Sequence, residues 1–145
     1  MSKTNIEWCD YSLNPVKGLC PVACDYCYAR RLYKRFHWDT DIRFSFADTM
    51  RAIFKIKKPS KIFIGSTIEL FGEWIHPAWQ NKMFSYIPLR FPEHTFIFLT
   101  KRPENLIKWS PFPENCWVGV SATNKLQFLA GMNHMVNVKA TVKFV

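Results

Sequence analysis

The alternation of short apolar runs with helical patterns most limits how this chain can fold. Four runs combine apolar and β-branched residues and are bounded by turn residues, as buried strands are: 61–65, 95–99, 116–120 and 140–145. Helical patterns lie between them, including two that open at Pro77 and Pro103. Strands that alternate with helices predict an α/β fold with a mostly parallel sheet. The length of 145 residues fits one domain, 1–145.

Two further helical patterns precede the first of these strands. Tyr28, Leu32 and Phe36 recur four residues apart and predict an apolar stripe. Basic residues lie between them: Arg30, Arg31, Lys34 and Arg35. Ser45 and Asp48 then resemble a capping box at the start of a second helix.

Composition narrows the range of functions. Twenty Lys and Arg against 11 Asp and Glu give a formal net charge of +9, which favours an anionic partner such as nucleic acid but also fits a solvated basic surface. No apolar run approaches the roughly 20 residues of a membrane span, and the first residues lack a secretory pattern, so we expect a cytoplasmic protein without a membrane partner. In a reducing compartment, five cysteines favour metal ligands or catalytic thiols over disulfides.

Three of the cysteines, Cys20, Cys24 and Cys27, lie in one short loop that runs into the first helix. Three thiolates can hold three irons of a four-iron four-sulfur cluster and leave the fourth iron open to a cofactor or substrate. A structural zinc site is the alternative, although zinc normally takes four ligands and a second cysteine pair is missing. The pattern favours the cluster and leaves zinc open.

Polar residues follow two of the predicted strands, where ligands bind in parallel β/α folds. Lys101 and Arg102 can bind a carboxylate or phosphate, or simply face solvent. Ser121 and Asn124 suit ribose hydroxyls, and helix capping is an equally good explanation for both.

The cysteine spacing, with aromatic Tyr26 before the third cysteine, resembles the CxxxCxxC signature of the radical S-adenosylmethionine superfamily. Further segments are similar to a phage-associated three-cysteine family of unknown function, often compared with spore photoproduct lyase: 4–8, 14–15, 27–29, 65–66, 70–72, 99–103 and 117–121. The resemblance implies a radical SAM enzyme on a partial β/α barrel that lacks the last strands of the family fold. We therefore expect this protein to be truncated at its C-terminus relative to the family.

The resemblance also implies the cofactors and partners. A 4Fe-4S cluster bound by the three cysteines would chelate S-adenosylmethionine, and an electron donor such as a flavodoxin or ferredoxin would reduce it so that a deoxyadenosyl radical forms. Tyr26 would lie near the adenine, Gly65 and Ser66 would meet the methionine ammonium, and Glu69 would add an acceptor. The charge and the comparison with the lyase suggest a nucleic acid or nucleotide substrate. The alternative function is a nucleic-acid-binding module, stabilised by zinc or by an inert cluster, without catalysis.

Overall fold

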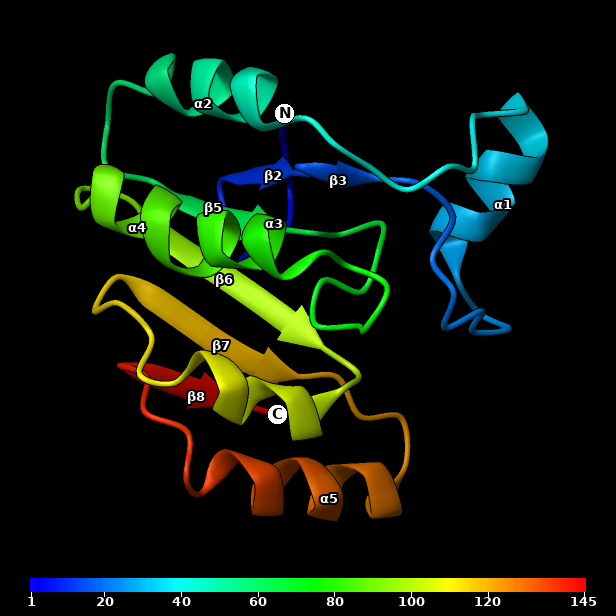
Figure 1. Cartoon of the computed structure of the whole chain (residues 1–145), viewed down its shortest axis with the longest axis vertical. Coiled ribbons are helices and arrows are strands. Elements are labelled where there is room, and N and C mark those ends of the chain that lie inside the picture. The colour runs from blue at the N-terminus through cyan, green and yellow to red at the C-terminus, as the bar shows by residue number, and fades with distance from the viewer.

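The computed structural model describes all of residues 1–145, and its centre is a six-stranded sheet in the order β1-β2-β5-β6-β7-β8 (Figure 1). The strands of this sheet are β1 (Ser2–Lys3), β2 (Tyr11–Leu13), β5 (Lys61–Ile64), β6 (Thr95–Thr100), β7 (Cys116–Val120) and β8 (Val142–Phe144). Only β1 is antiparallel to its neighbour; β2, β5, β6, β7 and β8 all pair in parallel. Two short strands, β3 (Val16–Lys17) and β4 (Arg43–Phe44), form a separate antiparallel pair.

The helices occupy the connections between the strands. They are α1 (Tyr28–Phe36), α2 (Phe46–Phe54), α3 (Pro77–Asn81), α4 (Ile87–Arg90) and α5 (Lys125–Met135). A π-helical turn, η1 (Lys82–Tyr86), joins α3 to α4, and a 3₁₀ helix, η2 (Pro103–Trp109), follows β6. None of these helices has the length and apolar character needed to cross a membrane.

The two faces of the sheet are buried unequally. Alternate residues of β5, β6 and β7, such as Ile62, Phe96 and Val118, belong to the main core of 23 buried residues beneath the helices. The intervening side chains face the other way, where Phe63 and Ile97 form a much smaller cluster with Cys9. Successive side chains of a strand point to opposite faces of the sheet, and both faces are buried here. This explains why the sequences of these strands are continuous apolar runs.

The predicted α/β class with a mostly parallel sheet is confirmed. The predicted strands at 61–65, 95–99 and 116–120 correspond to β5, β6 and β7, and the run at 140–145 contains the shorter β8. The sheet is open, with β1 and β8 at its edges, and forms no closed barrel. The sequence patterns missed β1 to β4, because strands of two or three residues are too short to show a period.

Two local predictions were wrong. Helix α1 turns Ala29 and Tyr33 inward, whereas Tyr28 and Phe36 of the expected stripe are exposed. The Tyr33 hydroxyl accepts a hydrogen bond from the Gly18 amide at 2.8 Å, and this bond fixes which face of α1 is buried. Ser45 precedes α2 as predicted, but its side chain makes no capping hydrogen bond.

Candidate functional site

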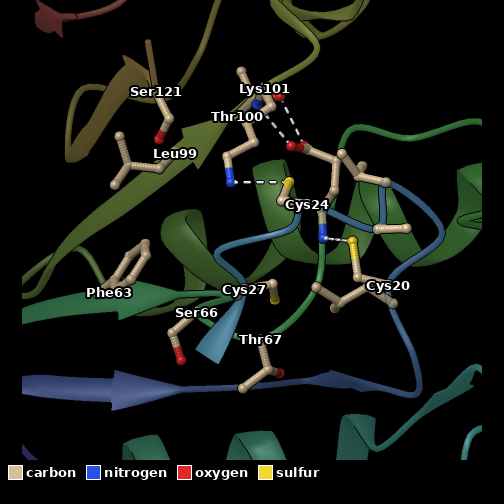
Figure 2. A pocket seen from close by; sticks show the side chains of 15 residues that line it. Cys20, Cys24, Cys27, Phe63, Ser66, Thr67, Leu99, Thr100, Lys101 and Ser121 are labelled. Atoms are coloured by element: carbon tan, nitrogen blue, oxygen red, sulfur yellow. Dashed lines mark hydrogen bonds between the residues drawn. The ribbon is translucent and has the colours of Figure 1, made fainter. Parts of the chain in front are cut away.

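The three loop cysteines line one cavity of about 140 Å³ at the carboxyl ends of β5 and β6, which we call the cysteine cavity (Figure 2). Five predicted site residues line it with them: Gly65, Ser66, Glu69, Lys101 and Ser121. The remaining lining residues, which the sequence reasoning did not single out, are Val22, Ala23, Phe63, Thr67, Ile68, Leu99 and Thr100. The fold therefore brings together loop residues 20–27 and the ends of three strands.

Backbone geometry shapes the cysteine loop. Ala23 has a positive φ of 54°, and the Cys27 amide donates to the Cys24 carbonyl at 3.0 Å, so the chain turns tightly between these cysteines. Cys27 then becomes the N-cap residue of α1. One turn into that helix, the Arg30 guanidinium donates to the Cys20 carbonyl at 2.7 Å, which ties the start of the loop to the helix.

The Glu69 carboxylate joins the loop after β5 to the end of β6. It accepts hydrogen bonds from the Thr100 hydroxyl at 2.7 Å, the Lys101 amide at 2.7 Å and the Phe71 amide at 3.0 Å. Burial raises the pKa of Glu69, and these hydrogen bonds partly oppose that rise. The Glu69 amide in turn donates to Cys20 Sγ at 3.4 Å, so the same residue also contacts a cysteine of the loop.

Lys101 reaches across the cavity to the cysteine loop. Its Nζ lies 3.4 Å from Cys24 Sγ (Figure 2). The same atom lies 4.7 Å from the centre of the Tyr26 ring. Burial disfavours the charged ammonium, but hydrogen bonding to Tyr26 and Cys24 outweighs it and raises the pKa of Lys101. The cavity therefore contains a fixed positive charge beside a thiol.

The turn after β5 depends on Gly65 and on a residue that the sequence reasoning missed. Gly65 has a φ of +85°, and a Cβ there would clash with the Leu70 side chain. Asn14 Oδ1 accepts from the Ser66 hydroxyl at 3.2 Å and from the Thr67 amide at 3.3 Å, which fixes the turn against β2. Asn14 lies in segment 14–15, which was used for the family resemblance, and that segment is the sequence signal that points to it.

Three other predicted residues lie outside the cysteine cavity. Tyr26 and Arg102 line a neighbouring cavity of about 520 Å³, which shares Cys24, Lys101 and Ser121 with the first. The Arg102 guanidinium lies 5.5 Å from the Trp74 ring centre. Asn124 lines neither cavity. Its Oδ1 accepts a hydrogen bond from the Gln127 amide at 2.9 Å and caps α5, so helix capping explains this residue.

No three His, Cys, Asp or Glu side chains are positioned to hold a single metal ion. Cys20, Cys24 and Cys27 are half-buried free thiols that line the cavity. The other two cysteines are buried elsewhere: Cys9 packs with Phe63 and Ile97, and Cys116 lies in the main core, where burial raises its pKa to about 12. Cys9 and Cys116 do not line the site.

Comparisons with known proteins identify a family. No curated protein matches the chain, and no solved structure matches it. A family model described as a protein of unknown function, DUF5131, matches residues 3–145. Since that match covers nearly all of the residues that build the sheet and the cysteine cavity, the chain belongs to the DUF5131 family.

Proposed function

We propose that this protein is a radical S-adenosylmethionine enzyme whose Cys20, Cys24 and Cys27 bind a 4Fe-4S cluster in the cysteine cavity. The observation that carries this proposal is that all three thiols line one cavity at the carboxyl ends of parallel strands. The open sheet would then be a partial β/α barrel of the radical SAM type. A cluster with one iron free of protein ligands supplies, when bound, the electron for reductive cleavage of the cofactor.

The donor set fits a cluster better than it fits a single ion. A cluster distributes its thiolate ligands over separate irons, so these ligands need to line a common cavity rather than converge on one point, and Cys20, Cys24 and Cys27 line one cavity. Two of the three sulfur atoms also accept hydrogen bonds, Cys20 Sγ from the Glu69 amide and Cys24 Sγ from Lys101 Nζ. Hydrogen bonds of this kind orient metal ligands and tune the electronic properties of the metal group.

The remaining cavity residues suit the polar groups of S-adenosylmethionine. Lys101 offers a cation for the methionine carboxylate, and the half-buried backbone around Gly65 and Ser66 offers acceptors for the ammonium. Ser121, which lines both cavities, supplies a hydroxyl, and Tyr26 supplies an aromatic ring in the neighbouring cavity. Arg102 faces the neighbouring cavity and is therefore assigned to substrate contact.

Anaerobic reconstitution with iron and sulfide, followed by electron paramagnetic resonance of the reduced protein, tests the proposal. We expect a cluster signal that changes when S-adenosylmethionine is added, because an open iron must bind it. Cys24→Ala should abolish the signal, whereas Cys116→Ala, which removes a thiol outside the cavity, should leave it intact. A cluster signal that does not change when S-adenosylmethionine is added would contradict the enzyme function.

The second candidate is a nucleic-acid-binding module in which zinc or an inert cluster stabilises the cysteine loop without catalysis. The basic surface of α1 favours it, since three of its cations are exposed: Arg31, Lys34 and Arg35. Stoichiometric zinc in the isolated protein, bound through the three cysteines and unaffected by S-adenosylmethionine, would support this function and rule out the radical mechanism.

A further inference from the structure

Helix α1 differs from the other helices in its position and charge. It lies at the side of the molecule beyond β3, apart from the helices that cover the sheet (Figure 1). Four of its nine residues are Arg or Lys, and none is acidic. The Arg30 guanidinium is bound to the Cys20 carbonyl, whereas the exposed cations Arg31, Lys34 and Arg35 form no ion pair with an acidic side chain.

Two aromatic rings continue this basic surface. Phe36 ends α1 and Trp38 follows it; the ring centres are 5.5 Å apart with an angle of 21° between the planes. The two residues are 51% and 47% exposed. Trp38 also packs edge-on against Tyr33, with the ring centres 5.3 Å apart, but it keeps this exposed surface. The Arg35 guanidinium lies 5.3 Å from the centre of the Phe36 ring. We call Arg31, Lys34, Arg35, Phe36 and Trp38 the α1 surface.

The opposite end of α1 lies at the cysteine cavity. The hydroxyl of Tyr28, the first residue of the helix, donates to the Ser66 carbonyl at 3.0 Å, and Ser66 lines the cavity. Nine residues at about 1.5 Å each give α1 a length of roughly 13 Å. A flexible polyanion bound along the α1 surface can therefore place one of its units at the cavity.

We propose that the α1 surface binds single-stranded nucleic acid. The three exposed cations suit three consecutive phosphates. The exposed aromatic rings offer surfaces on which unpaired bases can stack. A duplex hides its base faces and could not stack on the exposed surface of Phe36 and Trp38. The nearby carboxylate of Asp39 lies 3.3 Å from Arg43 Nη1, which offsets its repulsion of a phosphate. This inference names the substrate class of the proposed enzyme and depends on the proposed function only for turnover, since binding requires neither cluster nor cofactor.

Fluorescence anisotropy with labelled 12-nucleotide oligonucleotides tests the binding. The protein of residues 1–145 is titrated with single-stranded DNA, single-stranded RNA of the same sequence, and the corresponding DNA duplex, at several salt concentrations. We expect at least one single strand to bind about tenfold more tightly than the duplex. The comparison of DNA with RNA identifies which of the two the surface prefers.

Two triple variants separate a local surface from general charge. Arg31→Gln, Lys34→Gln and Arg35→Gln together should weaken binding about tenfold or more and lower the salt slope by about 2, since each phosphate contact to a single strand contributes about 0.7. The matched control combines Lys55→Gln, Lys57→Gln and Lys58→Gln, three exposed lysines at the end of α2 that lower the net charge equally. The control should lose less than about threefold.

Aromatic variants test stacking separately from charge. Trp38→Ala should weaken binding about tenfold without changing the salt slope, and Trp38→Phe should restore most of the affinity because it keeps a ring.

The proposal is overturned if the two triple variants lose affinity equally, if the duplex binds as tightly as the single strands, or if anionic lipid vesicles compete away the oligonucleotide. Oligonucleotide binding by a protein that forms no cluster would contradict the enzyme function alone, whereas a cofactor-responsive cluster without such binding would overturn this inference alone.

Discussion

Lys101 Nζ lies 3.4 Å from Cys24 Sγ, although the two residues are 77 positions apart in the sequence. Lys101 leaves the end of β6, and its backbone amide is held by the Glu69 carboxylate at 2.7 Å. Cys24 belongs to the loop before α1. The contact therefore links the sheet to the cysteine loop and places a positive charge beside one proposed cluster ligand.

Removal of this charge should make the reconstituted cluster harder to reduce. An ammonium beside a cluster sulfur stabilises the reduced, more negative state, so Lys101→Gln should shift the midpoint potential to more negative values. A tenfold change in the reduction equilibrium corresponds to about 59 mV for a one-electron couple. Redox titration followed by electron paramagnetic resonance measures the shift. Lys101→Arg, which keeps the charge, should shift the potential less, and Lys125→Gln, outside both cavities, should leave it unchanged.

Glu69→Gln should destabilise the protein by roughly 1–3 kcal/mol, because an amide cannot accept at both of its positions from the donors that now surround the carboxylate. Those donors are the Thr100 hydroxyl and the Lys101 and Phe71 amides. The urea midpoint of unfolding measures the loss. Glu114→Gln is the matched control, since Glu114 is exposed and makes no salt bridge. Equal midpoints for the two variants would show that the Glu69 network adds nothing to stability.

The alternation of apolar runs was sufficient to predict β5, β6 and β7 because these strands bury both faces. The same argument placed Lys101 and Ser121 at strand ends, and both line the cysteine cavity. The apolar periodicity did not show the role of Glu69. A glutamate in a polar loop has the same sequence context whether its carboxylate faces solvent or is buried against three hydrogen-bond donors. The hydrogen bonds of Glu69 depend on where the neighbouring strand lies, and a pattern of nearby residues in the sequence does not give that position.

The orientation of α1 was mispredicted for a related reason. A four-residue spacing suggested that Tyr28, Leu32 and Phe36 face the core, yet Tyr28 and Phe36 are exposed. The helix packs through Tyr33, whose hydroxyl accepts a hydrogen bond from the Gly18 amide. A backbone partner outside the helix thus decided which face is buried, and the exposed aromatic ring of Phe36 became part of the α1 surface.

Asn115 provides a test of a contact that no sequence pattern indicated. Its Nδ2 lies 3.0 Å from the Pro88 carbonyl, 3.2 Å from that of Phe91 and 2.9 Å from that of His94, so it connects the end of α4 to the start of β6. Asn115→Asp replaces the donor with a charged acceptor that faces these oxygens. We expect the free energy of unfolding to fall by about 2 kcal/mol or more, as measured in urea.

Two variants complete the Asn115 experiment. Asn115→Ala removes the donor without adding a charge and should be destabilised less than Asn115→Asp. Asn137→Asp makes the same substitution at an exposed position and should change stability by less than about 0.5 kcal/mol. If Asn115→Asp and Asn137→Asp unfold at the same urea concentration, the three carbonyl contacts do not stabilise the fold.

His94 should make the protein less stable in mild acid. Its side chain is buried, Nδ1 accepts from the Ser60 amide at 3.2 Å, and Nε2 has no hydrogen-bond partner. Burial lowers the pKa of His94, although the nearby Glu93 carboxylate partly opposes this shift. As pH falls below the ordinary histidine value of about 6.5, the unfolded protein therefore binds a proton before the folded protein does. The free energy of unfolding should decrease from about pH 6.5 down to the folded-state pKa, by at most about 1.4 kcal/mol per pH unit.

Urea unfolding between pH 5 and 8 measures the pH dependence that His94 contributes. His94→Gln should flatten it, exposed His134→Gln should not, and a wild-type slope that survives in His94→Gln would assign the pH dependence to another group.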